Sequence, residues 1–211
     1  MAGVPTTAGP AGRPLTVRVL RAADRTAVPW KNGGGVTRGI AAWPEGAGMD
    51  GFAWRVSLAE VGADGPYSAF PDIERTLTMV EGAGMDLTVG GQRRRVDERY
   101  VPQDFAGDEP TGCRLLGGPV ANFNVMYRRG RAQAETSVVR GRLRLAVPPG
   151  GTVLAVVLEG TAVLEGAGAR VELGLYDAVM VTGESRGGSS GESPGVLRTE
   201  GRAAVVTLRT R

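Results

Sequence analysis

The sequence predicts an all-β fold, a barrel or sandwich of many short strands with little helix. Glycine makes up 34 of the 211 residues, roughly twice its average usage, and it recurs between short apolar segments, where it suits tight turns. Residues 139–145 alternate between polar and apolar with the period of two of a half-buried strand. Helical spacing is scarce, and only residues 22–26 suggest a short turn. Short strands separated by Gly, Pro and Asp favour a barrel or sandwich over alternating strands and helices.

The individual strands follow from apolar runs bounded by turn residues. Residues 152–158 form a continuous apolar run that ends at Glu159-Gly160, as expected for a strand in a barrel core followed by its turn. In the segment 139–145, three arginines alternate with apolar or small residues. We expect further strands at 17–20, 54–58, 76–80, 86–89, 123–127, 171–173 and 203–208.

A weak internal sequence repeat, which we call the echo, indicates two halves. Thr76-Leu-Thr-Met-Val-Glu-Gly82 and Leu154-Ala-Val-Val-Leu-Glu-Gly160 each run through apolar residues to Glu-Gly and then to a second strand. The 211 residues suffice for one large domain or two tightly fused halves. We therefore predict a disordered tail at 1–14, a first half at 15–130 and a second half at 131–211, packed as one unit. Residues 130–137 are expected to be a polar connection, and the Gly- and Ser-rich stretch 183–195 a flexible loop.

Charge and cysteine content exclude several classes of protein. The net charge is only +3, and the basic residues are scattered, which argues against nucleic-acid binding. The run Arg93–Arg95 is expected to be a solvated, turn-like stretch. No apolar run approaches the length of a membrane span, and the lone Cys113 allows no intramolecular disulfide. These features predict a cytoplasmic protein that binds neither nucleic acid nor membrane.

Histidine is absent from the chain. This excludes histidine-ligated metal sites, Ser-His and Cys-His nucleophilic pairs, and histidine acid–base catalysis. The Gly-Gly-Ser-Ser-Gly stretch at 187–191 matches the pattern of a nucleophile elbow, but without a histidine partner we interpret the match as coincidence. We expect no metal and no cofactor.

A glycine-rich motif at 29–38 contains Trp30, Lys31 and Asn32 followed by three glycines. In a phosphate-binding P-loop the lysine follows the last glycine, whereas here it precedes the first, so we reject nucleotide binding. Lys31 is the only lysine among 25 basic residues. A position that arginine could fill would have become arginine in this chain, so the lysine favours a site for a compact charge over a surface role.

Two further segments carry polar residues with a defined spacing. In the strand 52–58, Trp54 belongs to one face, with Val56 and Leu58, while Arg55 and Ser57 belong to the other, which faces solvent or a polar cavity. The stretch 62–75 resembles the first cupin motif. It has Ser68 and Phe70 where that motif has its two histidines, and Glu74 at its acidic position.

Together with Asn122-Phe-Asn-Val-Met-Tyr127, the motifs at 30–35, 52–57 and 65–75 make the chain similar to the HutD/Ves family over residues 15–130. The resemblance implies a cupin-type double barrel, or bicupin, with the second half as its second cupin-like unit. It also implies an association with bacterial histidine utilisation, as a metabolite-sensing brake on that pathway. The resemblance by itself does not imply a particular enzyme activity, so the question of catalysis stays open at this point.

We expect the ligand to be a small acidic metabolite in the mouth of the first barrel. Lys31 and one of Arg55 or Arg75 would bind a carboxylate, because ammonium and guanidinium groups together can clamp an acid. Glu74 is expected either to neutralise Arg75 or to face the ligand. Asn32, Ser57 and Asn124 would supply hydrogen bonds, and Trp30, Trp54, Phe70 and Phe105 would form an apolar wall.

Two functions remain open from the sequence. The first is binding of an acidic intermediate of histidine degradation, such as formylglutamate, that modulates flux. The second is a metal-independent cupin isomerase or hydrolase that uses Glu74 or Lys31 as acid or base. We favour binding, because no nucleophile–base pair is evident. The sequence leaves the oligomeric state open, with a homodimer as one alternative.

Overall fold

The computed structural model describes residues 15–166, 169–183 and 192–211, and the chain there is almost entirely β-strand. The expected all-β fold is confirmed, and the turn expected at 22–26 is a short 3₁₀ helix, η1 (Ala22–Asp24). No helix in these ranges is long and apolar enough to cross a membrane. The predicted tail 1–14 and the 187–191 motif lie outside the described residues, as does most of the predicted loop 183–195.

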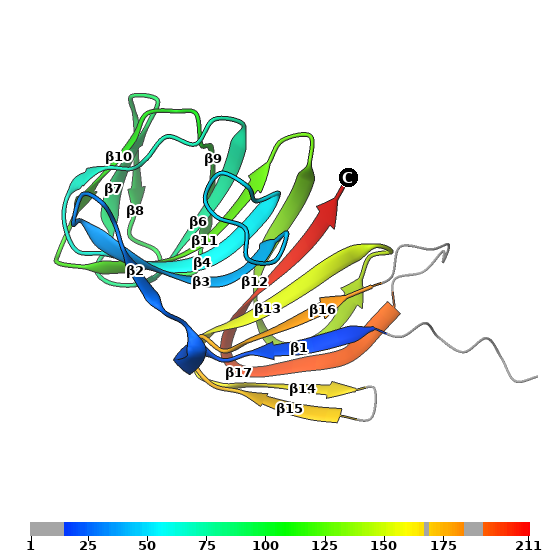
Figure 1. Cartoon of the computed structure of the whole chain (residues 1–211). Helices are drawn as coiled ribbons and strands as arrows, with labels where there is room; N and C mark the ends of the chain where they lie inside the picture. Colours follow the sequence, from blue (N-terminus) through cyan, green and yellow to red (C-terminus); the bar gives the residue numbers. More distant parts are fainter. Residues whose placement is uncertain (1–14, 167–168, 184–191) are drawn as a thin grey trace, which may run out of the picture.

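The first half is a barrel made of two sheets (Figure 1). A six-stranded sheet has the order β2-β3-β4-β11-β6-β9, and a four-stranded sheet has the order β5-β10-β7-β8. Their inner faces enclose an apolar cluster that includes Leu77, Met85 and Leu87. The strands are β2 (Ala27–Pro29), β3 (Gly35–Trp43), β4 (Trp54–Val61), β5 (Gly65–Pro66), β6 (Ile73–Glu81), β7 (Met85–Val89), β8 (Gln92–Val96), β9 (Pro102–Ala106), β10 (Thr111–Leu115) and β11 (Val120–Arg128).

The second half is a seven-stranded sheet that curls around its own core (Figure 1). Its order is β1-β16-β13-β17-β14-β15, and β12 pairs with β17 along nearly its whole length. The core is aliphatic, with Val153, Leu164 and Leu197 each at most 3% exposed. The strands are β1 (Thr16–Leu20), β12 (Ala132–Val147), β13 (Gly151–Glu159), β14 (Ala162–Gly166), β15 (Ala169–Leu173), β16 (Ala178–Thr182) and β17 (Glu192–Thr210).

The two halves repeat one strand arrangement. In the first, β6 lies between β11 and β9, and in the second, β13 lies between β17 and β16. The connection from β6 to β7 turns at Gly82 and the connection from β13 to β14 turns at Gly160, and both glycines have positive φ (102° and 68°), which glycine adopts without steric cost. The echo between residues 76–82 and 154–160 therefore corresponds to equivalent strands in the two halves.

The halves are joined by a large shared apolar cluster. The outer face of the six-stranded sheet contributes Trp54, Val56 and Phe123, and the facing sheet contributes Val156 and Val206, each at most 3% exposed. Because burying a large apolar side chain contributes about 1.5–3 kcal/mol, this cluster fixes the halves as one unit. The outer face of β4 is thus covered by the second half, which leaves only its other face for the barrel interior.

Four expectations about local structure were wrong, wholly or in part. The strand β1 pairs with β16 in the second half, so residues 16–20 do not belong to the first. The run Arg93–Arg95 reaches solvent as expected, but it lies within β8 and not in a turn, because an edge strand tolerates charged side chains. Residues 132–137, expected as a polar connection, begin β12, and residues 192–195, expected as loop, begin β17.

Candidate functional site

Polar side chains project into the first barrel from its three central strands, β4, β11 and β6. Side chains alternate between the two faces of a strand, so the residues between those that pack on the second half point into the barrel. We call the inward-pointing set Arg55, Ser57, Asn122, Asn124 and Arg75 the inner polar face. Ser57, Asn122 and Arg75 are buried there, and Arg55 and Asn124 are half-buried.

Two arginines share one row of this face. Met126 of β11 is the direct partner of Arg55 on one side and of Arg75 on the other. Since neighbouring strands lie about 4.8 Å apart, the two arginine Cα atoms are roughly 10 Å apart. Ser57 and Asn124 are direct partners in the next inward-facing row. The face thus carries two cationic groups beside hydroxyl and amide groups.

Arg75 has an unusual environment. Its side chain is among the buried residues, 9% exposed, and its Cζ lies 4.9 Å from the ring centre of Phe105 and 5.4 Å from those of Tyr67 and Phe70. The Nε and Nη1 atoms are buried without a hydrogen-bond acceptor. Burial lowers the pKa of Arg75 to about 10. Aromatic faces attract a cation but accept no strong hydrogen bond, so the guanidinium is held while its Nε and Nη1 groups lack an acceptor.

Arg55 is the second cation of the face. Burial lowers its pKa as well, and within the described residues neither Arg55 nor Arg75 has an acidic partner. Its Nη2 lies over Gly39 of β3, 3.9 Å from where a Cβ would be. Gly39 is exposed although its register partner Ser57 is buried. Solvent therefore reaches the sheet beside Arg55.

The glycine-rich motif forms the hairpin between β2 and β3. Lys31 is exposed at its tip. The Asn32 side chain accepts a hydrogen bond from the Gly34 backbone N–H (3.1 Å) and so stabilises its own turn. Trp30 packs against Tyr67 with ring centres 6.0 Å apart. The structure thus brings Trp30, Phe70, Phe105 and Arg75 into one region of the barrel, while Lys31 and Asn32 occupy the hairpin turn.

Two predicted site residues lie elsewhere. Trp54 is on the opposite face of β4 and is only 3% exposed, in the apolar cluster between the halves. Glu74 precedes Arg75 in the same strand, so it points to the other side of the sheet and does not neutralise it. Glu74 pairs instead with Arg129 (3.3 Å). The predictions for these two residues were wrong, since adjacent strand residues face opposite sides.

Sequence reasoning missed Tyr67 and Asn122. Tyr67 lies within the motif at 65–75, and Asn122 is two residues before Asn124 on the same face of β11. Asn122 is 1% exposed and its Oδ1 has no hydrogen-bond partner. The period of two along β11 is the signal that would have added Asn122 to the site.

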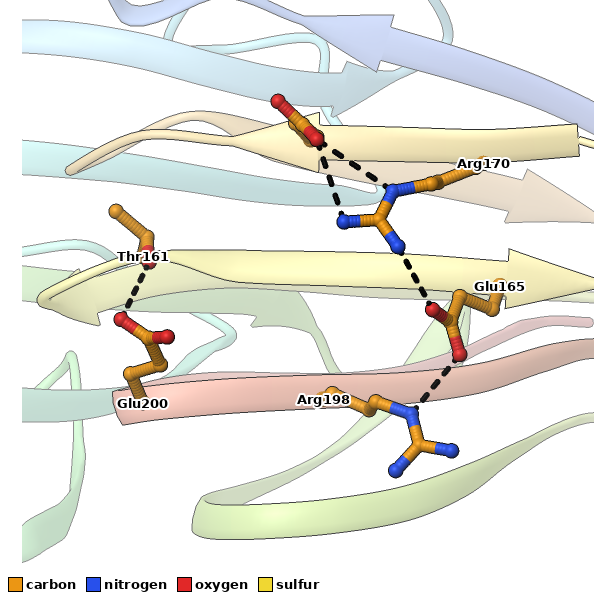
Figure 2. A network of polar contacts seen from close by, with 6 residues as sticks. Thr161, Glu165, Arg170, Arg198 and Glu200 are labelled. Carbon is orange, nitrogen blue, oxygen red and sulfur yellow. Dashed lines mark hydrogen bonds and ion pairs between the residues drawn. The ribbon is translucent and has the colours of Figure 1, made fainter.

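Two other groups of charged side chains consist of ion pairs. On the outer face of the four-stranded sheet, a shallow hollow of about 840 Å³ contains Asp86, whose carboxylate accepts hydrogen bonds from Arg93 and Arg114 (2.6 Å each). On β14, β15 and β17, Glu165 lies between Arg170 (3.1 Å) and Arg198 (2.9 Å), as Figure 2 shows. Exposed ion pairs contribute at most about 1 kcal/mol each. We place the candidate site on the inner polar face, where the cations are unpaired.

The acidic side chains do not form an evident metal centre. Among the residues that the structure describes, no group of three or more His, Cys, Asp or Glu is placed to hold a metal ion.

Comparisons with known proteins agree with this architecture. The HutD family model matches residues 22–197. A Pseudomonas putida protein described as an uncharacterized 21.2 kDa protein in the hutC 3' region is 35% identical over 92% of this chain and 98% of its own length. The protein Ves of Cronobacter sakazakii is 33% identical over 59% of this chain and 67% of its own.

Solved structures of other proteins are similar to this chain in fold. HutD from Pseudomonas fluorescens SBW25, described as a formate condition, is 34% identical, with a TM-score of 0.78 over 93% of this chain and 100% of that one. A cupin 2 conserved barrel domain protein from Leptotrichia buccalis is 9% identical, with a TM-score of 0.52 over 84% of this chain and 89% of that one. The second likeness concerns the fold alone and confirms the expected cupin-type barrel.

Proposed function

Because this chain belongs to the HutD family, we propose that it binds a small carboxylate metabolite at Arg75 and thereby modulates bacterial histidine utilisation. One observation carries the proposal: Arg75 is buried in the first barrel with two nitrogen atoms that lack any acceptor. Leaving a buried donor unsatisfied costs about 1–3 kcal/mol. A ligand oxygen at these donors would recover that cost.

A carboxylate is the ligand that suits this arginine. The guanidinium is planar and offers a fork of N–H donors that matches the two oxygens of a carboxylate. Tyr67, Phe70 and Phe105 surround Cζ and exclude water, which strengthens a charge-assisted hydrogen bond.

The rest of the face indicates a ligand with a second acidic group. Arg55 lies in the same row, roughly 10 Å away, and Ser57 and Asn124, in the next row, can bind a polar group of the same ligand. Formylglutamate, a dicarboxylate of histidine degradation, has this chemistry. The P. putida relative, described by its place in the hutC 3' region, supports the pathway.

Binding without turnover is the form of this function that the geometry supports best. The enzymatic alternative relied on Glu74 or Lys31 as acid or base. Glu74 points away from the inner polar face and pairs with Arg129, and Lys31 is exposed in the hairpin turn. We also propose that binding is independent of metal, since the chain contains no histidine.

Calorimetric titration with formate, formylglutamate, glutamate and urocanate tests the proposal. Arg75→Gln should weaken binding about ten- to a hundredfold, because a hydrogen bond to a charged group contributes about 1.5–3 kcal/mol. Arg202→Gln is the matched control: Arg202 also lies over an aromatic ring, that of Tyr100 at 4.6 Å, but belongs to the second half. Equal affinities of Arg75→Gln and wild type, or no binding of any acid to the wild type, would refute the proposal.

A further inference from the structure

The indole of Trp30 is fixed on several sides. Its Nε1–H donates to Thr37 Oγ1 (2.7 Å), and its backbone N–H donates to the Gly35 carbonyl (2.9 Å). Both partners belong to β3, the strand that follows the hairpin. A side chain that is held by its polar edge and by its own backbone has little freedom to turn.

Gly35 provides the space in which this indole lies. A Cβ at residue 35 would lie 3.2 Å from Trp30 Cδ2 and Cε3, and 2.3 Å from the backbone oxygen of Glu60. Real Cβ atoms essentially never approach another atom as closely as 2.3 Å. Glycine is therefore required at residue 35, because any side chain there would collide with the Glu60 carbonyl and press on the Trp30 ring. This explains the third glycine of the motif.

The fixed indole in turn holds Tyr67. The two rings meet edge to face, with centres 6.0 Å apart and an angle of 85° between their planes. The Tyr67 backbone N–H donates to the Thr111 carbonyl (2.8 Å), and the hydroxyl donates to Met85 Sδ (3.6 Å). These contacts leave one ring face of Tyr67 against Arg75, at 5.4 Å from Cζ.

We infer that Trp30 is a positioning residue for Arg75, and that it acts through the Tyr67 ring. The sequence of contacts runs from Thr37 to Trp30, from Trp30 to Tyr67, and from Tyr67 to the guanidinium. The glycine-rich hairpin is then a support that orients the buried cation. Its importance for ligand affinity rests on the proposed function, whereas its effect on the orientation of Arg75 does not.

The test compares Trp30→Leu with Trp43→Leu, a matched substitution at an exposed tryptophan (51%) that ends β3, at the opposite end of that strand from the hairpin turn. The first measurement is the ¹⁵N–¹H nuclear magnetic resonance signal of Arg75 Nε in the ligand-free protein, assigned by its loss in Arg75→Gln. Trp30→Leu should displace this signal and accelerate its exchange with water, because the Tyr67 ring is released. Trp43→Leu should leave the signal unchanged.

The second measurement is calorimetry with formate. An edge-to-face ring pair is worth a few- to roughly tenfold in an equilibrium constant, so Trp30→Leu should weaken formate binding by about that factor. Trp30→Phe retains a ring against Tyr67 and should restore most of the affinity. If Trp30→Leu does not fold, Thr37→Val carries the same test, since it removes the acceptor that orients the indole.

The outcomes separate the two proposals. An Arg75 Nε signal in Trp30→Leu that coincides with that of the wild type overturns the positioning role. A displaced signal in a protein that binds no carboxylate supports the positioning role and refutes the proposed function. A displaced signal with formate affinity equal to that of Trp43→Leu shows that orientation of Arg75 by Trp30 does not matter for binding, and overturns the inference in its functional part.

Discussion

Replacing Arg75 by methionine should stabilise the fold and abolish carboxylate binding. Burial lowers the pKa of this guanidinium from its ordinary value to about 10. Since a factor of ten in proton affinity corresponds to about 1.4 kcal/mol, the folded state disfavours the charged form by about 3 kcal/mol. Above pH 10, up to the ordinary pKa of arginine, the unfolded chain binds the proton more tightly, so stability rises with pH there, and below pH 10 the whole penalty is present.

Methionine has a similar length, packs well against rings and carries no charge. Arg75→Met therefore removes the penalty of about 3 kcal/mol, although it also loses the attraction of three aromatic rings for the cation. Their centres lie 4.9–5.4 Å from Cζ, toward the outer limit of such contacts, so we take the lower value of about 0.5 kcal/mol for each ring, or about 1.5 kcal/mol in total. We expect the free energy of unfolding at pH 7 to rise by about 1–2 kcal/mol. Formate, which should raise the melting temperature of the wild type, should have no effect on the variant.

Urea denaturation measures the first effect as a higher midpoint with an unchanged slope. The control is Arg202→Met, because Arg202 is 36% exposed, pairs with Glu159 and lies over Tyr100. This control should be neutral or slightly destabilising. A midpoint that falls for Arg75→Met as far as for Arg202→Met, or a formate-dependent melting temperature in Arg75→Met, would refute the reasoning.

Two further predictions follow from where the sequence-predicted residues lie. Trp54→Ala should lower the free energy of unfolding by about 3–5 kcal/mol, since Trp54 is 3% exposed between the halves, whereas Trp43→Ala, at 51% exposure, should change it by less than about 0.5 kcal/mol in urea denaturation. Lys31 is exposed at the hairpin tip, where an ion pair with the carboxylate contributes at most about 1 kcal/mol. Lys31→Ala should therefore weaken formate binding by up to about fivefold, and Lys31→Arg, which keeps the charge, should retain most of the affinity. Unchanged calorimetric affinity in both variants would remove Lys31 from the site.

The alternation of side chains along β4 could be predicted from the sequence, but the environment of each face of the strand could not. Trp54 and Arg55 were correctly placed on opposite faces. In a single barrel one face of such a strand meets solvent, whereas in this double barrel both are covered, one by the second half and the other by the barrel interior. Nothing local to residues 52–58 distinguishes these two environments. Trp54 was therefore assigned to the ligand wall as well as to the core.

Two other predictions were wrong because they relied on the charge of the residues and not on the two-residue alternation of side chains in a strand. Arg93–Arg95 contains three charges, which suggested a turn, but β8 is an edge strand of a small sheet, where alternate arginines reach solvent. Glu74 and Arg75 were considered as a neutralising pair because they are adjacent. Adjacent side chains in β6 point to opposite faces of the sheet. A strict use of the period of two would have placed Glu74 on the outer surface, where it pairs with Arg129, and Arg75 on the inner face as a buried cation.

The repeat within the chain gives an independent reason to assign a function to Arg75. When the two halves are aligned at Gly82 and Gly160, the residue equivalent to Arg75 in the second half is Val153. Val153 is 1% exposed and packs in an aliphatic cluster with Ala155 and Val157. At the equivalent position the second half thus has a small apolar side chain, and it adopts the same strand arrangement. A charge at residue 75 is not required by the barrel, and with its pKa lowered by burial it opposes folding. Since an apolar residue would be more stable there, the arginine requires an explanation outside the fold, and binding of an acidic ligand provides one.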